Sequence, residues 1–556
     1  MNFKNIILGL FILLVFFTGI GQRPYMPPSE ARYIEIAREM VETGDWLTPQ
    51  INGIPYFEKP PLFYWLQAFQ IKNFGMGEYS GRFPTAVLSL LIGLFSYFLA
   101  RVYESKPVGY WSLAIIASSF LFAAASRIVL LDMPVTAFIT FCLGSYMLSF
   151  NKKFSGCTKN IFIYLTYFFS ALAVLTKGLI GIAIPGLIIF IHLLLQSRLA
   201  EVLRFNFFSG LLLFLAIAAP WFVWASLNYE GYFEYFFIFE HFTRYATDSH
   251  RRYQPFWFYI PIILLGFLPW TFLMLQGLKA AFKKRKEAFT SFLLIWAIAP
   301  VAFFSLSNSK HITYILPSIP PLAIITATYL VSLLQGNNKL KSVSAALVVF
   351  GLTLLSIAAL IYIRVLPESD PVHADIYRIF DPIIPFFITA GVAMLAALLL
   401  RSNYVKLAML MVGSATTLQL ADHTMAKLEY RYNKEISLKV KEALQPGEKV
   451  YCLNCYFPDV TVYLNRDITI VESLGELKYG YRYVKPIDMG SFQMMPENFI
   501  NIAPFWQFQC YNPKNKMYIF MNKSAYQEML AKPGYSCKWK IFAENKFKVV
   551  LTNKDM

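Results

Sequence analysis

The stretch P-P-S-E-A-R-Y-I-E-I-A-R-E-M-V-E-T-G-D-W-L-T-P-Q-I-N-G-I-P-Y-F-E-K-P-P-L-F-Y-W, Pro27–Trp65, organises the whole chain. It is the longest polar segment in the first half of a very apolar sequence, and it directly follows the first hydrophobic span. Its charges are too many for a lipid-facing helix. Residues 31–42 have apolar positions at helical spacing, and Asn52-Gly53 indicates a turn. The segment therefore predicts either an amphipathic helix on the membrane surface or a helix and loop that build a site there.

The composition indicates a membrane protein. Of the 556 residues, 57% are hydrophobic and 17% are aromatic. Apolar runs of roughly 17–25 residues recur along the chain, which excludes an ordinary soluble globule. Basic cytoplasmic connectors and anionic lipid account for the net charge of +17, so it does not require a nucleic-acid partner. The first span, Ile6–Ile20, also looks like a signal peptide, but its cleavage site is weak and we expect an anchoring helix.

The hydrophobic runs predict a polytopic α-helical membrane protein with about thirteen transmembrane helices. With the N-terminus inside, Lys and Arg gather in the connectors predicted to be cytoplasmic, for example in Lys279–Lys286, as the positive-inside rule requires. Loops 21–65 and 228–255 and the residues after 421 then lie outside. The predicted helix centres are Leu13, Leu91, Ser118, Phe141, Ser170, Pro185, Phe214, Leu265, Trp296, Ile325, Leu354, Gly391 and Met411.

A second domain is predicted after residue 421. Helices are expected at Asn433–Leu444 and Lys523–Leu530. Runs of β-branched and aromatic residues predict strands K-V-Y-C-L (449–453), V-T-V-Y-L (460–464), D-I-T-I-V (467–471), M-Y-I-F-M (517–521) and K-V-V-L-T (548–552). The predicted organisation is a membrane domain, 1–421, and a soluble periplasmic α/β domain, 422–556.

The cysteines indicate the compartment of this second domain. Cys452, Cys455, Cys510 and Cys537 all fall in it, and an oxidising space would give at least one disulfide among them. A redox-active C-x-x-C pair is the alternative, but such a pair usually begins a helix, whereas this one follows a predicted strand.

Three blocks of the opening segment carry a family resemblance. E-A-R-Y-I-E-I-A-R-E-M, G-D-W-L-T-P-Q-I-N-G and Y-F-E-K-P-P-L-F-Y-W occur in order at tight spacing. They resemble the first periplasmic loop of the bacterial aminoarabinose (lipid A) transferases, which are polyprenyl-phosphate-sugar-dependent glycosyltransferases of the type C fold and are similar to the protein O-mannosyltransferases. The resemblance implies that Lys59 binds the donor phosphate and that Arg32, Tyr33 and Tyr56 shape the pocket.

Two charged residues stand at predicted membrane boundaries. Asp132, in R-I-V-L-L-D-M-P-V-T, is either a helix cap facing water or a functional carboxylate. Lys177, in L-A-V-L-T-K-G-L-I-G, is either a snorkelling lysine or a counter-charge for a lipid phosphate. Both blocks resemble family motifs, which implies a catalytic role for Asp132 and donor-phosphate binding by Lys177.

Two further blocks match the family. F-I-F-E-H-F-T-R-Y and S-H-R-R-Y-Q-P-F-W resemble a large periplasmic loop, which implies phosphate binding by Arg244 and Arg252 and a divalent ion shared by Glu58 and His241. Two protein ligands make a weak metal site, so we expect no required cofactor. S-N-S-K-H-I-T-Y-I-L-P is similar to another family block, which adds Tyr314 to the pocket. In the same block, Lys310 either binds phosphate or marks a helix end.

One residue departs from the family pattern. Where the family usually has Asp-Glu, this chain has Ser29-Glu30. This leaves three options: Glu30 replaces the missing carboxylate, Asp132 suffices, or the protein is inactive. A phosphate acceptor is already ionised near neutral pH and needs no general base, so the change favours such an acceptor.

The predicted function is transfer of 4-amino-4-deoxy-L-arabinose, or a similar sugar, from undecaprenyl phosphate to lipid A or a related envelope glycolipid, with inversion. The predicted location is the bacterial inner membrane, with the site and the C-terminal domain in the periplasm. Transfer to protein Ser/Thr and a lipid transporter are the alternatives. A transporter usually carries polar or broken helices at mid-membrane, whereas the charges here gather at one face.

Overall fold

The computed structural model describes residues 3–201, 206–243, 254–336, 340–365, 383–426, 432–453, 455–471, 477–483, 487–489, 492–494, 499–500, 516–531 and 539–553. The chain forms two compact units, each made of two separate segments. Unit 1 comprises Met1–Ile20 and Arg82–Met425, and unit 2 comprises Gly21–Gly81 and Ala426–Met556.

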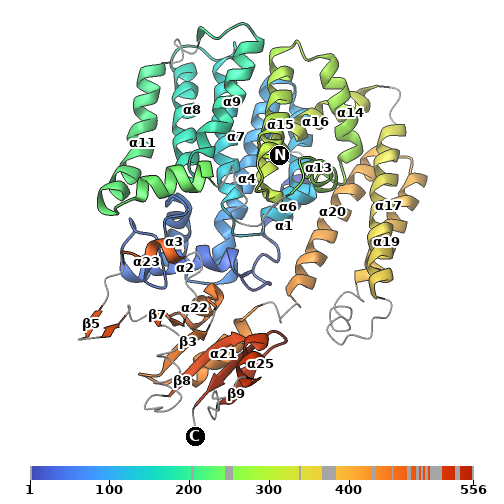
Figure 1. Ribbon diagram of the computed structural model, residues 1–556. Coiled ribbons are helices and arrows are strands. Elements are labelled where there is room, and N and C mark those ends of the chain that lie inside the picture. The colour runs from blue at the N-terminus through green and yellow to red at the C-terminus, as the bar shows by residue number, and fades with distance from the viewer. Residues whose placement is uncertain are drawn as a thin grey trace. The chain divides into compact units, whose positions relative to one another are not determined.

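Unit 1 is helical, and its long helices lie side by side (Figure 1). The helix α4 begins at the end of unit 2 and continues through unit 1. The elements are α1 (Phe3–Phe17), α4 (Glu78–Tyr103), α5 (Lys106–Ser118), α6 (Phe120–Ala125), α7 (Asp132–Ser149), α8 (Gly156–Lys177), α9 (Ile180–Leu195), α11 (Phe207–Asn228), η1 (Glu234–Thr243), α13 (Tyr259–Gly266), α14 (Thr271–Lys283), α15 (Ala288–Leu306), η2 (Ile312–Ser318), α16 (Ile319–Gln335), α17 (Leu340–Val365), α19 (Ile383–Ala396), η3 (Ala397–Leu399) and α20 (Asn403–Ala426).

The predicted helix positions are confirmed, whereas the predicted number of spans is not. Each predicted centre falls within a helix. By length and composition, however, five helices of the described part can cross a membrane, or six if α13 and α14 form one span bent by 111°. Helices such as α9 and α19 are apolar but shorter than the roughly 20 residues that a full crossing needs. Unit 1 is therefore a multi-pass helical membrane unit.

The helix α7 forms the centre of unit 1. All of its residues are buried, because α8, α9 and η2 pack around it. Close packing between α8 and α9 depends on Gly181, where a Cβ atom would lie only 2.3 Å from the backbone carbon of Ala173. Gly178, with φ of +83°, lets the chain turn immediately after Lys177. These glycines let α9 turn back and pack closely against α8 directly after Lys177.

An ion pair of a buried arginine ties the two ends of unit 1 together. Arg127 pairs with Asp422 of α20. Its guanidinium also donates to the backbone oxygens of Val15 and Thr18, at 2.8 and 2.6 Å. Arg127 is 1% exposed, so the carboxylate and carbonyl oxygens replace its lost hydration. The pair therefore joins α1, the α6–α7 connection and α20.

Unit 2 combines two helices and a hairpin from the first segment with an α/β layer from the second. The first segment contributes α2 (Ser29–Thr43), β1 (Gln50–Ile51), β2 (Ile54–Pro55) and α3 (Leu62–Phe74). Asn52 and Gly53 connect β1 and β2 with φ of 55° and 71°, which confirms the predicted turn. The second segment contributes α21 (Lys434–Ala443), β3 (Lys449–Leu453), α22 (Pro458–Leu464), β4 (Thr469–Val471), α23 (Lys478–Tyr481), β5 (Ile487–Met489), β6 (Phe492–Met494), β7 (Phe499–Ile500), β8 (Met517–Asn522), α25 (Lys523–Ala531), β9 (Lys540–Glu544) and β10 (Lys548–Thr552).

The main sheet of unit 2 has six strands in the order β7-β4-β3-β8-β10-β9. β3 runs parallel to β4 and β8, while β8, β10 and β9 pair antiparallel. Four predicted strands are confirmed as β3, β4, β8 and β10, and the two predicted helices as α21 and α25.

The prediction of a strand at V-T-V-Y-L was wrong, because these residues belong to α22. Pro458 occupies the first turn of this helix, where proline is favourable, and Asn465 ends it with φ of 57°. The buried carboxylate of Asp459 accepts hydrogen bonds from the backbone and the side chain of Asn433, both at 2.9 Å. This tertiary contact outweighs the β propensity of the valines.

Hydrogen bonds join the two segments of unit 2. The Asn52 amide donates to the backbone oxygen of Ile468 and accepts from the Ile468 N–H, both at 2.8 Å. Arg38 donates to both carboxylate oxygens of Glu35 and to Asp467 at 2.8 Å. The polar segment that opens the chain therefore folds together with the C-terminal residues in unit 2. The predicted division at residues 421 and 422 stays a prediction.

Candidate functional site

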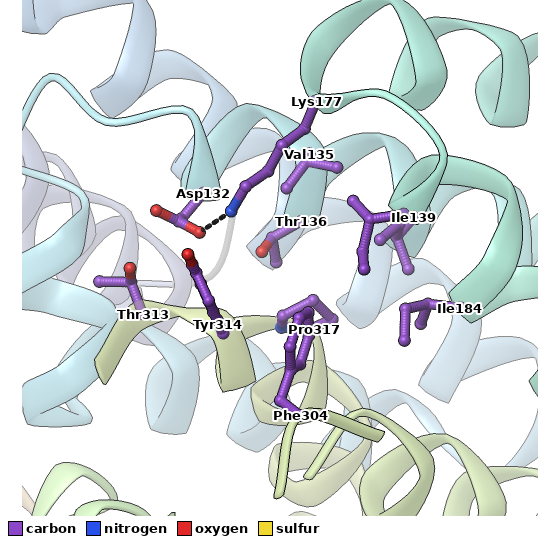
Figure 2. Close-up of a pocket in the computed structure, with 11 residues that line it drawn as sticks. Asp132, Val135, Thr136, Ile139, Lys177, Ile184, Phe304, Thr313, Tyr314 and Pro317 are labelled. Atoms are coloured by element: carbon purple, nitrogen blue, oxygen red, sulfur yellow. Dashed lines mark hydrogen bonds and ion pairs between the residues drawn. The ribbon is translucent and has the colours of Figure 1, made fainter. Parts of the chain in front are cut away.

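An ion pair between Asp132 and Lys177 is the centre of the candidate site in unit 1 (Figure 2). The Nζ of Lys177 lies 2.5 Å from a carboxylate oxygen of Asp132. Asp132 begins α7 and Lys177 ends α8, so the α7–α8 hairpin brings them together although 45 residues separate them. Their side chains are 11% and 17% exposed, so the pair is mostly shielded but remains reachable.

Residues of η2 complete the surroundings of this pair. The Lys177 ammonium lies 4.4 Å from the ring centroid of Tyr314, in a cation–π arrangement. Thr313 lines the same pocket as Asp132. His311 Nδ1 lies 2.7 Å from the Thr313 hydroxyl oxygen. The Lys177 ammonium thus holds the carboxylate, and a threonine hydroxyl that lies beside the His311 imidazole lines the same pocket.

A small pocket opens beside the pair, between α7, α8, α9, α15 and η2. Figure 2 shows the side chains that surround it. Its wall is mainly apolar, with Ile139, Ile184 and Phe304 among the lining residues. The buried hydroxyl of Thr136, one helical turn beyond Asp132, lines the pocket and has no hydrogen-bond partner within the described part of the chain. The pocket can therefore offer an ammonium, a carboxylate and a hydroxyl to a polar group, next to an apolar wall.

The sequence predicted Asp132, Lys177 and Tyr314 as site residues, and the structure brings these three together. Thr313 and Thr136 were missed. For Thr313 the available signal was its position beside Tyr314 in the matched block, and for Thr136 it was the spacing of four residues from Asp132 on a helix.

Lys310 lies close in sequence to this group but has other partners. Its Nζ donates to the backbone oxygen of Gln254 at 2.9 Å and to that of Ser307. The side chain is buried, and the pocket lining does not include it. These contacts favour the role of fixing the start of η2, which was one of the two predicted roles.

The predicted residues of the first segment lie in unit 2. Glu30 is fully buried, accepts from the Met26 N–H at 2.9 Å and lies 3.4 Å from the Arg23 guanidinium. Arg32 donates to the Tyr56 hydroxyl at 2.9 Å. Ser29 begins α2, and the Tyr33 ring packs against Phe63 and Tyr64. These contacts give the loop a defined shape.

Other predicted ligands are described only in part. The Lys59 ammonium donates to the backbone oxygen of Glu58 at 2.6 Å. His241 lies in η1, but its side chain is outside the described residues, as are Arg244 and Arg252. The predicted Glu58–His241 metal pair stays a prediction.

One acidic cluster in unit 2 has the spacing of a metal site, formed by Glu35, Glu39 and Asp467. Arg38 lies among these carboxylates and pairs with Glu35 and Asp467 at 2.7 and 2.8 Å. Glu39 also accepts from the backbone N–H groups of Asn52 and Gly53. The oxygens are therefore already in use, and the cluster does not fit a cation. Burial, reinforced by the nearby carboxylates, raises the pKa of Glu39 well above its usual value.

The cysteines of unit 2 are free where they are described. Cys452 is buried in β3, and Cys455 is partly buried just after it. Cys510 and Cys537 lie outside the described residues. No disulfide therefore involves Cys452 or Cys455 in this structure, and the prediction now rests on Cys510 and Cys537.

Comparison with known proteins identifies the family. The model of the dolichyl-phosphate-mannose-protein mannosyltransferase family matches residues 6–284, half of the chain. A protein of Pseudomonas savastanoi pv. phaseolicola, named an undecaprenyl phosphate-alpha-4-amino-4-deoxy-L-arabinose arabinosyl transferase, is 32% identical over 366 residues, which are 65% of this chain and 68% of that protein. The chain belongs to the aminoarabinose transferase family.

Other members of this family extend the match. A Proteus mirabilis protein of the same name, numbered 1, is 37% identical over 369 residues, 65% of each chain. The chain thus spans slightly less than two thirds of this relative. A Shewanella sediminis transferase is 28% identical over 510 residues, 88% of this chain and 90% of that one.

A solved structure shows the fold. The crystal structure of ArnT from Cupriavidus metallidurans bound to undecaprenyl phosphate superimposes with a TM-score of 0.86 and covers 99% of this chain and 98% of that one, at 23% sequence identity. The type C glycosyltransferase fold predicted from the sequence is therefore confirmed.

Proposed function

We propose that the protein is an integral inner-membrane glycosyltransferase that moves 4-amino-4-deoxy-L-arabinose, or a similar sugar, from undecaprenyl phosphate to lipid A or a related envelope glycolipid. The names of its relatives support the donor and the sugar. The observation that carries the proposal is the ion pair between Asp132 and Lys177, which places a cation and a carboxylate beside an apolar wall. In a transfer between two lipids, the cation would serve the donor phosphate, the carboxylate the acceptor or the sugar, and the apolar wall the hydrocarbon parts of the substrates.

In the proposed reaction the acceptor oxygen attacks the anomeric carbon from the face opposite the donor phosphate. The bond between that carbon and the phosphate oxygen breaks, and undecaprenyl phosphate leaves with the electron pair, so the configuration inverts. Lys177 has three N–H donors and gives one to Asp132, which leaves two for the developing phosphate charge. The carboxylate of Asp132 positions the acceptor or the sugar, and the Lys177 ammonium partly neutralises the charge of this carboxylate.

The loop residues are assigned to the donor and the pocket by the family resemblance. Lys59, Arg244 and Arg252 would add positive charge for the donor phosphate, with Lys310 supporting the loop. Glu30 and Ser29 occupy the position of the family's carboxylate pair. Arg32, Tyr33 and Tyr56 shape the loop of unit 2, and Tyr314 shapes the pocket of unit 1. The hydrogen bond between Arg32 and Tyr56 at 2.9 Å holds these two side chains of unit 2 together. No cofactor is required, and a divalent ion between Glu58 and His241 would be accessory.

We propose that the chain crosses the membrane about thirteen times, with the cluster of lysines at 279–286 inside and the domain 422–556 in the periplasm. Reporter tags test this orientation. A tag at Lys284 should lie inside, and tags at Asp248 and Asn522 should lie outside. Cytoplasmic activity of a reporter at Asn522 would overturn both the orientation and a periplasmic site.

The decisive test is the lipid A mass spectrum of a host with and without the gene. Addition of one aminoarabinose mass that depends on the gene and disappears in Asp132→Asn supports the proposal. An unchanged lipid A spectrum together with glycosylated Ser/Thr peptides would instead establish the protein O-mannosyltransferase-like alternative. Movement of lipid without any mass change would establish a transporter.

Ser29→Asp tests the nature of the acceptor. If the acceptor is a phosphate, a new carboxylate should leave activity unchanged or lower it, because it repels the incoming anion. If the acceptor is a hydroxyl, the added base should raise activity. Ser29→Asn is the matched control, because it changes the size of the side chain without the charge.

A further inference from the structure

A long groove of about 760 Å³ runs along α9 and α15 in unit 1. Its apolar wall includes Leu187, Ile191, Ile298, Ala302 and Phe303. Ile298 is 58% exposed, so the groove opens sideways instead of being closed inside the helices. Its volume falls in the usual range of ligand sites, roughly 300–1,000 Å³.

The groove is polar at one end only. Gln196 and Ser197, which follow α9, line this end together with Ser291 of α15. Arg285 and Lys286, in the connection between α14 and α15, add two cations. The lining contains no carboxylate, and the neighbouring Glu287 lies 4.0 Å from Lys284. An apolar channel that ends in two cations matches a molecule with a hydrocarbon chain and an anionic head.

This polar end is distinct from the candidate catalytic site. Lys177 precedes α9, whereas Gln196 and Ser197 follow it. α9 has 16 residues, so about 24 Å separate its two ends. A donor whose phosphate lies at Lys177 cannot place the same phosphate at Arg285. The cations of the groove therefore serve a different headgroup.

We propose that this groove binds an anionic glycerophospholipid, with the phosphate at Arg285 and Lys286 and an acyl chain along α9 and α15. Basic pockets between membrane helices recognise such headgroups, and each cation adds to the attraction of an anionic lipid. The inference goes beyond the transfer reaction, and only the exclusion of the donor phosphate rests on the proposed function. The lipid would fill the space between α9 and α15 and hold the two helices that line the pocket next to Lys177.

Native mass spectrometry of the full-length purified protein tests the proposal. The protein is titrated with phosphatidylglycerol or phosphatidylcholine, and the bound lipid is counted. The wild type should retain phosphatidylglycerol in preference to phosphatidylcholine. The double variant Arg285→Gln, Lys286→Gln should bind phosphatidylglycerol about 30-fold more weakly, since two favourable charges are lost.

A matched pair of variants separates this site from general surface charge. Lys283→Gln, Lys284→Gln removes the same charge from the same basic run, but neither residue lines the groove. Its affinity for phosphatidylglycerol should stay within about 3-fold of the wild type, since screened surface charges contribute little. Ala302→Trp should lower retention without any change of charge, because it fills the apolar channel.

Three results would overturn the proposal. One is equal retention of the two lipids by the wild type. The second is an equal loss of affinity in both double variants, which would mean surface electrostatics alone. The third is displacement of phosphatidylglycerol by undecaprenyl phosphate, unchanged by Arg285→Gln, Lys286→Gln, which would assign the groove to the tail of the donor. None of these results bears on the lipid A mass spectrum, so the inference and the proposed function fail separately.

Discussion

Single and double substitutions of the Asp132–Lys177 ion pair should change the free energy of unfolding and the transfer activity in different ways. An exposed pair contributes about 1 kcal/mol or less, whereas loss of one partner of a fully buried pair costs about 3–5 kcal/mol. With side chains 11% and 17% exposed, this pair lies nearer the buried limit. We expect Lys177→Met to lower the free energy of unfolding by about 3 kcal/mol, because it leaves a shielded carboxylate without its cation.

Asp132→Asn should cost less stability than Lys177→Met. The ammonium of Lys177 keeps its contact with the Tyr314 ring and, being more exposed, can move toward water. The double variant Asp132→Asn, Lys177→Met should recover part of the loss, since no unpaired charge remains. Activity should behave differently: Asp132→Asn should reduce transfer by at least ~100-fold, and the double variant should recover none of it.

The assay combines thermal unfolding of the purified protein in detergent with transfer to lipid A by the same preparation. Arg127→Met and Asp422→Asn provide the control, because this ion pair of unit 1 joins a buried arginine to a partly buried aspartate outside the candidate pocket. Each control variant should lose stability yet keep transfer per folded molecule within about 3-fold, as expected for sites without shared partners. Full transfer by Asp132→Asn, or equal loss of transfer in the control, would refute a catalytic role for the pair.

Three more outcomes are expected. Thr313→Val should reduce kcat about 10-fold with little change in stability, on the scale of losing one polar group that lines the pocket with Asp132, whereas Thr326→Val, at a hydroxyl bonded only to its own helix, should leave kcat unchanged. Because burial raises the pKa of Glu39 in the folded protein, unit 2 should lose stability as the pH rises above about 4.5, the pKa of this carboxyl in the unfolded chain. Glu39→Gln should flatten this pH dependence when unfolding is measured from pH 4.5 to 8. Burial also raises the pKa of the Cys452 thiol, so a maleimide should label Cys455 first and should label Cys452 only after unfolding. Equal labelling rates of the two cysteines would contradict the burial of Cys452.

The sequence predicts the helices of unit 1 well because apolar runs of sufficient length form helices whatever their neighbours. It cannot settle how many of these helices cross the membrane, since α9 and α19 are apolar but short. In unit 2, local propensity predicted β3 and β8 correctly but failed at Val460–Leu464. The bond between Asp459 and Asn433 that favours α22 joins residues 26 positions apart, and no local pattern records it.

The charged residues of the candidate site were predictable from the sequence, whereas its threonines were missed. Asp132 and Lys177 stand out as charges at the ends of apolar runs, and resemblance to the family assigned both to the site. Thr313 and Thr136 are ordinary residues of membrane helices by sequence, and only their position in the lining of the pocket distinguishes them. The pairing of Asn52 with Ile468 is equally hidden, because 416 residues separate the two.

The composition of unit 2 from two distant segments has a consequence for biosynthesis. Roughly 340 residues lie between Gly81 and Ala426, and ribosomes add about 5–20 residues per second. The first segment therefore waits roughly 20–70 s for its partner after it has been made. During this interval Glu35 and Arg38 lack Asp467, and Asn52 lacks the backbone of Ile468. A chain that stops short of residue 426 would keep this polar segment unfinished indefinitely, and would present it to the proteases that remove incomplete membrane proteins.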